Sequence, residues 1–449
     1  MKRSAATYPL GAVGCAAVPR LSSIDRRIIG LAVPALGSLA VEPVYILVDT
    51  AIVGQLGTDQ LAGLAIAATV LSFVFAGANF LTYGTTERVA RRLGAGDRPA
   101  AANVGVQAMW LSLLFGLPTA PLLYLGAGPI ARVFGASGEV LEHAETYLSL
   151  SAIGVPFFLI TLAAQGVLRG ASDYTTPLWV LLGANVANLV IELYLVFVLD
   201  MGVAGSALST VIAQVGAGLV FLAILRPQLA RATVRRPDLE GMRPLMSAGK
   251  YLLLRVGSML AVFGGSTAIA ARIDKSTLAA HQIANSMFIF LALVLDALAV
   301  PAQTIVAEQL GKHDVSTAAH VARRSARLSL WVGIALTVLL GVLAPVIPHL
   351  FSDDAAVIDR ATSALWWLAA ALVPGAIAFA HDGVLIGAGD YRFLGRAAFA
   401  YLAAISPVAV LILIVPGLGI AGIWGGLLIW MILRAVVNDR RTANVLTAG

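Results

Sequence analysis

The sequence predicts an all-α integral membrane protein in which twelve transmembrane helices form two parallel-repeat bundles of six helices each. Three observations lead to this prediction: an apolar composition, twelve long apolar segments, and an internal repeat with a constant offset. Of the 449 residues, 59% are hydrophobic and 12% are charged, whereas soluble chains are about 45–50% apolar and about 25% charged. These charges are too few to cover a water-facing surface, so we expect the lipid bilayer to surround the chain.

The composition also excludes several classes of function. A single cysteine, Cys15, excludes disulfide frameworks and cysteine-ligated zinc or iron–sulfur sites. The net charge of +6 would favour nucleic acid only on a polar domain, and the sequence has none. The phosphate-binding motif Gly-x-x-x-x-Gly-Lys does not occur. We therefore expect no nucleic-acid partner, no ATP hydrolysis, no metal site and no organic cofactor.

Twelve apolar segments are long enough to cross the bilayer. About 20 mostly apolar residues span the hydrocarbon layer of about 30 Å. Their apolar runs are continuous, which indicates helices, because barrel strands alternate polar and apolar residues. The expected spans are 28–53, 61–86, 103–126, 145–168, 178–199, 203–225, 246–271, 278–306, 326–347, 361–386, 395–415 and 418–437.

Lysine and arginine residues are distributed unevenly between the two sides of these spans. The two termini and every second loop hold 24 of the 30, and the opposite side holds four. Basic loops remain in the cytoplasm, so we expect an inner-membrane protein with both termini cytoplasmic. Residues 1–23 are interpreted as a disordered cytoplasmic leader, because their apolar part is too short for a signal peptide.

An internal repeat divides the chain into two halves. Three blocks recur at an offset of 217 residues, namely 58–97 at 275–314, 166–170 at 383–387, and 202–205 at 419–422. An even number of spans in each half means that both halves run in the same direction, as in transporters with parallel repeats. We expect an N-terminal half at 24–225, a cytoplasmic linker at 226–244, a C-terminal half at 245–441, and a substrate site between the halves.

Several motifs resemble the multidrug and toxic compound extrusion (MATE) family, over about residues 24–440. They are Pro34, the run VDTAIVGQLG at 48–57, the block 166–170 with Asp173, and GVAGSAL at 202–208. Glu42-Pro43 and Asp382-Gly383 resemble its DinF-type branch in particular. The resemblance implies export of lipophilic, often cationic compounds in exchange for protons or sodium. Sodium-coupled members carry a carboxylate within span 7, and none precedes Asp274 at its end here, which favours protons as the coupling ion.

Span 1 contains two carboxylates that are expensive to place in a bilayer. Glu42 and Asp49 are seven residues apart and therefore lie on one face of a helix. Pro43 removes a backbone hydrogen bond and allows a kink. A carboxylate beside a bendable point is typical of a proton-operated switch, and Asp49 matches the family's span-1 aspartate. The alternative for Asp49 is a solvated carboxylate at the end of the helix.

Span 5 offers Asn185, Asn188 and Glu192. Asn188 and Glu192 are four residues apart and share one helical face. The archaeal-type members of the family have an aspartate at the position of Glu192, so the longer side chain changes its reach. We predict that Asp49, Glu42, Glu192 and Asn188 couple transport to a cation. The alternative for Glu192 is an ion pair with Arg132 or a lipid headgroup.

Four further residues are candidates for the substrate cavity or its support. Asn79 and Asp296 occupy equivalent positions in the repeat, and Asn79 could equally serve in helix packing. Asp296 lies deep in span 8, and Arg255 in span 7 is its expected ion-pair partner. Asp382 precedes the repeated glycine block, where a structural role is favoured. The set of supporting residues comprises Pro43, Asn79, Asn185, Arg255, Asp296 and Asp382.

The leading interpretation is a secondary antiporter of alternating access, working as a monomer in the lipid bilayer on lipophilic or cationic small molecules. The alternative transport function is a flippase for a lipid-linked or lipid-like substrate, which would need a cationic cavity. Arg255 is the one deep positive charge that the sequence indicates, so the balance of charges favours a neutral or cationic substrate. A membrane-embedded enzyme is disfavoured, because no clustered His/Asp motif occurs at one membrane face.

Overall fold

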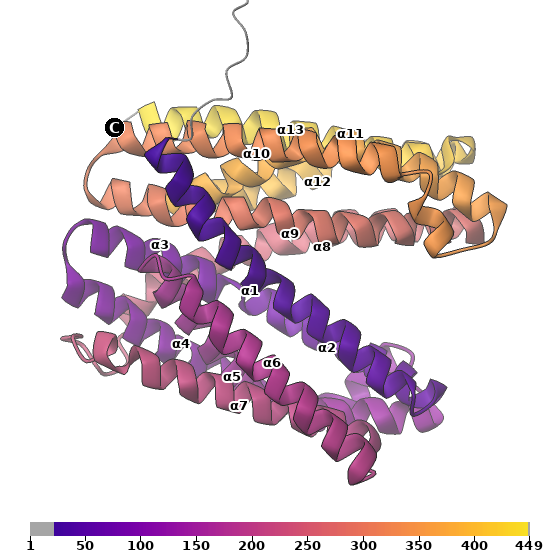
Figure 1. Ribbon diagram of the computed structural model, residues 1–449, viewed down its shortest axis with the longest axis horizontal. Helices are drawn as coiled ribbons and strands as arrows, with labels where there is room; N and C mark the ends of the chain where they lie inside the picture. Colours follow the sequence, from indigo (N-terminus) through magenta and orange to yellow (C-terminus); the bar gives the residue numbers. More distant parts are fainter. Residues whose placement is uncertain (1–21, 448–449) are drawn as a thin grey trace, which may run out of the picture.

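The computed structural model describes residues 22–447, which form helices joined by short loops (Figure 1). Twelve helices in this part of the chain are long and apolar enough to cross a membrane, which confirms the predicted fold. The expected leader lies outside the described residues, apart from its last two. The helices are α1 (Ser23–Gly54), α2 (Thr58–Ala78), α3 (Phe80–Gly94), α4 (Arg98–Val133), α5 (Gly138–Gly170), α6 (Thr175–Leu193), α7 (Gly202–Leu229), α8 (Leu239–Ile273), α9 (Lys275–Gly311), α10 (Val315–Leu343), α11 (Ala355–Gly387), α12 (Tyr391–Ile414) and α13 (Gly419–Thr447).

The helices differ from the expected spans in length and in two interruptions. Most extend beyond the apolar segment, because polar caps start them outside it; α4 begins after Asp97, whose carboxylate accepts a hydrogen bond from the Ala100 amide at 2.9 Å. Span 2 is divided at Asn79 into α2 and α3. Span 5 consists of α6 and a terminal π-helical turn at Tyr194–Val198.

The repeat predicted from the sequence recurs in the helix boundaries. Four pairs of helices start 217 residues apart: α2 and α9, α4 and α10, α5 and α11, and α7 and α13. The loops before α4 and α10 are equivalent in detail, because Asp314 caps α10 through the Thr317 amide at 2.9 Å, as Asp97 caps α4. The sequence duplication is therefore a duplication of six-helix units.

The two halves meet at a pair of equivalent glycines. A Cβ atom on Gly94 of α3 would lie 2.1 Å from the carbonyl oxygen of Glu308, and one on Gly311 of α9 would lie 2.0 Å from that of Arg91. Glu308 is the repeat equivalent of Arg91, so each half makes the same contact with the other. Such reciprocal contacts are the signature of a two-fold axis, here passing between α3 and α9.

The halves are joined at one end and separate toward the other (Figure 1). We call the joined end the basic end, because it holds the arginine-rich loops after α3 and α9. Every hydrogen bond between the halves within residues 22–447 lies there, such as Arg91 to the Ala388 carbonyl at 2.8 Å, Gln303 to the Tyr83 carbonyl at 2.9 Å, and Tyr174 with Thr304 at 2.6 Å. The two halves therefore diverge from the basic end in the shape of a V.

Helix α1 belongs to both halves. Near the basic end, the buried carboxylate of Asp25 forms an ion pair with Arg324 of α10, and Ile28 packs in an apolar cluster with α9 and α10. At its other end, Val53 packs in the core of the N-terminal half. Figure 1 shows α1 crossing from one half to the other. The helix therefore links the C-terminal half to the site described next.

Candidate functional site

A pair of buried carboxylates lies inside the N-terminal half. Asp49 of α1 is 5% exposed and Glu192 of α6 is fully buried, and the two side chains are neighbours. Ser206 of α7 donates a hydrogen bond to Asp49 Oδ1 at 2.6 Å. Neither carboxylate oxygen of Glu192 has a hydrogen-bond partner. Glu192 is therefore the least satisfied acidic group of the cluster, and it makes no ion pair with Arg132.

Hydroxyl and amide groups surround the pair. Thr210 of α7 donates to the Ser206 carbonyl at 3.0 Å, so its oxygen accepts the proton of Tyr45 at 2.7 Å. The amide nitrogen of Asn188 lies 3.5 Å from the same oxygen, and the amide oxygen of Asn188 has no partner. Tyr147 of α5 lies beside Thr210. We call Asp49, Glu192, Asn188, Ser206, Thr210, Tyr45 and Tyr147 the carboxylate cluster.

The carboxylate cluster has more acceptors than donors. Glu192 presents two unpaired oxygens and Asn188 presents one, all shielded from solvent. A buried acceptor without a donor costs about 1–3 kcal/mol, and more if it is charged. A bound proton or small cation relieves this cost, so the arrangement is suited to reversible uptake of a positive charge. No group of three or more His, Cys, Asp or Glu side chains within residues 22–447 could hold a metal ion.

Local backbone features place the cluster where two helices deviate from regular geometry. Glu192 lies two residues before the π-helical turn at Tyr194–Val198, and such turns occur frequently at functional sites. Helix α1 contains Pro34 and Pro43 before Asp49. Proline lacks the amide hydrogen, so the helix can bend at both points.

Glu42 does not join the cluster, although it shares a helical face with Asp49. Its side chain is exposed and makes no hydrogen bond or ion pair with another described residue. Asp49 is covered by Glu192 of α6 and Ser206 of α7, whereas the side chain of Glu42 is left uncovered. Pro43 is half-buried, and Asn185 is half-buried with its amide donating to the Leu181 carbonyl at 3.1 Å. Asn79 is exposed at the break between α2 and α3.

The expected ion pair between Arg255 and Asp296 is wrong. Arg255 of α8 instead donates to Asp382 of α11 at 2.6 Å, and Arg434 of α13 donates to the same carboxylate oxygen at 2.7 Å. Asn438 donates to the other oxygen at 2.7 Å. Asp382 attracts Arg255 more strongly because it is buried, whereas Asp296 is half-buried and has no ion-pair partner among the described residues. Arg255 is also not the one deep positive charge, since Arg434 and Arg169 are buried too.

Sequence reasoning missed the hydroxyl groups of the cluster and the partners of Asp382. Ser206 lies in the GVAGSAL motif at 202–208 that opens α7, so the motif indicates its position without its role. Arg434 stands near the end of the last span, where it is indistinguishable from the other basic residues of the C-terminus. Tyr45 and Tyr147 carry no signal in one sequence, because aromatic residues are common in membrane helices.

Comparisons with known proteins give a consistent result. The MatE family model matches residues 34–195 and 254–415. Protein DETOXIFICATION 44, chloroplastic, from Arabidopsis thaliana is 30% identical over 94% of this chain and 83% of its own length. DNA damage-inducible protein F from Escherichia coli (strain K12) is 29% identical over 93% of this chain and 91% of its own length.

Solved structures show the same fold. One, described as the outward-facing conformation of a multidrug resistance MATE family transporter of the MOP superfamily, superposes with a TM-score of 0.87 at 22% identity, over 95% of this chain and 97% of that chain. A MATE structure described as the bent conformation gives a TM-score of 0.89, also at 22% identity, over 95% and 96% of the two chains.

Proposed function

The chain belongs to the MatE family of multi-pass membrane transporters, and from this membership we propose that it is a secondary antiporter of the DinF-type branch. It exports lipophilic or cationic compounds in exchange for protons, by alternating access between two orientations of its halves. The observation that carries this proposal is the buried pair of Asp49 and Glu192, with its excess of unpaired acceptors. The protein lies in the inner membrane as a monomer, with the basic end in the cytoplasm.

Protons enter this scheme at the carboxylate cluster. Two adjacent carboxylates in a water-poor site are costly to charge together, so the pair shares one proton and exchanges a second. When Asp49 is charged, the hydroxyl of Ser206 holds it at 2.6 Å. When Asp49 is protonated, this hydrogen bond weakens, and the last turns of α1, after Pro43, are released from α7. A proton shifts the conformational equilibrium only because it binds the two orientations with different affinity.

Helix α1 transmits the change to the other half. Its first turns are held on α10 by Asp25 and Arg324, so a bend at Pro43 alters the relation between the carboxylate cluster and the C-terminal half. Protonation of Asp49 thus bends α1, narrows the cavity of the N-terminal half and weakens substrate binding. Substrate leaves as the proton arrives, which is the order of events that antiport requires.

Carboxylates without an ion-pair partner favour a cationic substrate. Arg255 and Arg434 are both engaged by Asp382, and Arg169 donates to Gln165 at 2.8 Å. Glu42 and Asp296 are accessible and have no ion-pair partner within the described chain. A flippase for a lipid-linked anion would instead require arginines free to bind its headgroup.

Purified protein in liposomes tests the proposal. An imposed pH gradient should drive uptake or efflux of a fluorescent lipophilic cation by the wild type and by D59N, a control at an exposed aspartate of α2. D49N should bind the cation weakly at every pH, and P43A should bind protons but respond less. If D49N keeps the wild-type pH dependence of substrate binding, Asp49 is not the coupling residue. Fluorescent-lipid scrambling without cation export would support the flippase instead.

A further inference from the structure

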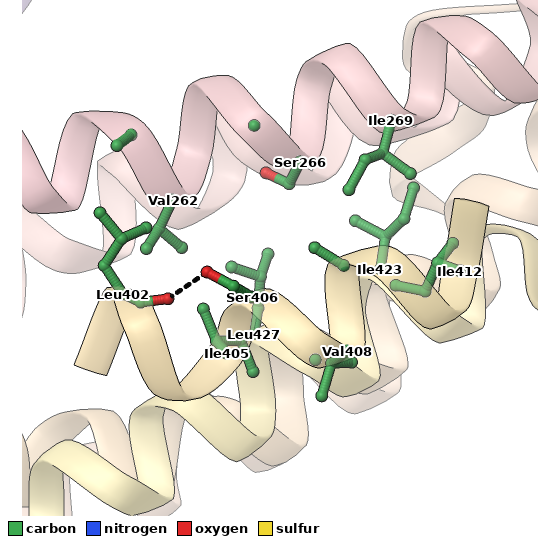
Figure 2. Close-up of a pocket in the computed structure, with 14 residues that line it drawn as sticks. Val262, Ser266, Ile269, Leu402, Ile405, Ser406, Val408, Ile412, Ile423 and Leu427 are labelled. Carbon is green, nitrogen blue, oxygen red and sulfur yellow. Dashed lines mark hydrogen bonds between the residues drawn. The ribbon is translucent and has the colours of Figure 1, made fainter. Parts of the chain in front are cut away.

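The C-terminal half contains a cavity at the positions that hold the carboxylate cluster in the N-terminal half. Its volume is about 90 Å³, and it lies between α8, α12 and α13 (Figure 2). The lining residues follow the 217-residue offset: Ser266 is the equivalent of Asp49, Ala409 of Glu192, and Leu427 of Thr210. One ancestral site has therefore become polar in one half and apolar in the other.

The lining of the cavity contains no charged residue. Its two hydroxyl groups are already satisfied, because Ser266 donates to the Phe263 carbonyl and Ser406 to the Leu402 carbonyl, each at 2.8 Å. Figure 2 shows the second of these bonds beside Val262, Ile405 and Leu427. A cation or an ordered water would find too few ligands here to replace its hydration. The cavity is chemically suited to hydrocarbon alone.

Smaller side chains account for the space. At the position equivalent to Glu192 the C-terminal half has Ala409, and at the position equivalent to Ser209 it has Gly426. Gly265 adds to the opening, because a Cβ atom on it would meet nothing within 4 Å. An empty apolar cavity lowers the stability of the fold in proportion to its volume. A ligand that fills the cavity restores the lost apolar contacts, which favours binding.

One wall of the cavity is α8, the helix that also contacts the N-terminal half. Its first turns pack on α3 and α4, where Gly249 lies against Phe80, and the cavity begins about three turns farther along the same helix, at Ala261. Helix α1, the equivalent of α8, packs on α9 near Ile28 and carries Asp49 of the carboxylate cluster farther along. Each site is therefore connected to the boundary between the halves through one continuous helix, as a substrate subsite in an alternating-access transporter requires.

We propose that this cavity is a binding subsite for the uncharged aromatic or branched alkyl part of the exported amphiphile. The proposal rests on the proposed export function and assigns the substrate's apolar part to the C-terminal half. Its apolar lining is the complement of the carboxylates Glu42 and Asp296, which have no ion-pair partner within the described chain and are assigned to the cationic part. An engineered apolar cavity of about 150 Å³ binds benzene, so this smaller, partly open cavity fits a single ring or a short branched chain.

Two adjacent glycines provide a matched test. A Cβ atom added to either Gly264 or Gly265 of α8 would lie in open space, but only Gly265 lines the cavity. We expect G265L to weaken binding of tetraphenylphosphonium, a cation surrounded by four uncharged rings, about tenfold, equivalent to about 1.4 kcal/mol. G264L should bind it as the wild type does. A409L, which fills the cavity from α12, should reproduce G265L and serves if G265L folds poorly.

The measurement is equilibrium binding to full-length protein in nanodiscs, without a pH gradient. Equal affinity of all three variants and the wild type would overturn the subsite, and so would equal losses in G264L and G265L. Nanodiscs with brominated acyl chains provide the lipid arm. If these chains quench tryptophan fluorescence less in G265L than in the wild type while cation affinity is unchanged, the cavity holds bilayer lipid and the proposal is wrong.

The same proteins separate this proposal from the antiport proposal. If G265L and A409L lose affinity and G264L does not, but a pH gradient drives no cation export by the wild type, the subsite stands and antiport fails. If the wild type exports the cation and G265L binds it normally, antiport stands and the subsite fails.

Discussion

The two halves of the molecule place opposite chemistry at equivalent positions. The N-terminal half buries Asp49 and Glu192 with few partners, where the C-terminal half has Ser266 and Ala409 around an apolar cavity. Conversely, the C-terminal half buries Asp382 with two arginines. The N-terminal equivalents of these three residues are uncharged, namely Gln165 for Asp382, Ser38 for Arg255 and Ala217 for Arg434.

This difference separates buried carboxylates that can gain and lose a proton from buried carboxylates that must stay charged. Asp382 is neutralised by Arg255 and Arg434 and is hydrogen-bonded by Asn438, so adding a proton would leave two buried cations unpaired. Glu192 has no partner to lose. A carboxylate can serve as a proton carrier only where both of its charge states are tolerated, and for this reason the proposed antiport assigns coupling to the N-terminal half.

The largest expected effect is on stability in the C-terminal half. D382N leaves Arg255 and Arg434 without their counter-charge, and removing one partner of a buried pair costs about 3–5 kcal/mol. E192Q removes no partner and should change stability little. Thermal unfolding of both variants in detergent tests the contrast. If D382N is as stable as the wild type and abolishes gradient-driven export while D49N exports normally, the roles of the halves are reversed.

The second effect is on coupling. D49N should reduce gradient-driven export about 100-fold, equivalent to about 2.7 kcal/mol, because the asparagine cannot change its charge. The equivalent change in the other half, S266A, removes no ionisable group and should leave the dependence of export on the pH gradient unchanged. Initial rates of dye efflux from liposomes under equal pH gradients measure both. A comparable loss in S266A would mean that the two sites act together.

The third effect concerns a contact that is the same in both halves, so equivalent variants should behave alike. G94A and G311A each place a methyl group against a carbonyl oxygen of the other half, at 2.1 and 2.0 Å before relaxation. Such overpacking costs about 1–3 kcal/mol and should favour separation at the basic end by similar amounts in both variants. Accessibility of introduced cysteines at this end reports the shift, with G264A as control. Unequal shifts would show that the two-fold relation is not maintained during transport.

The smallest effect concerns the caps of α4 and α10. Hydrogen bonds from Thr317 and Ser316 lower the pKa of Asp314 from 3.8 to about 2. The charged carboxylate therefore stabilises the fold above pH 3.8, and this contribution is lost as the pH falls toward 2. D314A should unfold at lower temperature than the wild type near neutral pH, and the gap should close in acid. D97A, the equivalent cap in the other half, should lower the unfolding temperature at neutral pH as D314A does.

The sequence predicted most of the fold because its determinants are local or periodic. Apolar length identified the twelve spans, and a constant offset identified the repeat, which the helix starts reproduce. The break of span 2 at Asn79 was not predicted. The repeat gives no sign of it, because the equivalent residue, Asp296, lies inside the uninterrupted helix α9. The helix ends were underestimated, since polar residues outside the bilayer carry no apolar signal.

The site was predicted in part. Residues on one helix can be placed on a face from their spacing, and so Asn188 and Glu192 were grouped correctly. Grouping across helices needs the tertiary packing. Glu42 and Asp49 share a face, but only Asp49 is covered by neighbouring helices. Arg255 was paired with Asp296 because both were expected deep in neighbouring spans, and only the tertiary structure shows that its side chain reaches Asp382 of α11 instead.

In the proposed mechanism, the attachment of α1 to both halves makes it a lever with its fulcrum at Pro43. One end is fixed on α10 through Asp25, and the other carries Asp49. At 1.5 Å per residue, Asp49 lies about 9 Å beyond Pro43, so a kink of about 20° displaces it sideways by about 3 Å. That displacement exceeds the 2.6 Å between Ser206 and Asp49. A kink of this size at one proline would therefore be enough to take the carboxylate out of reach of its hydroxyl partner.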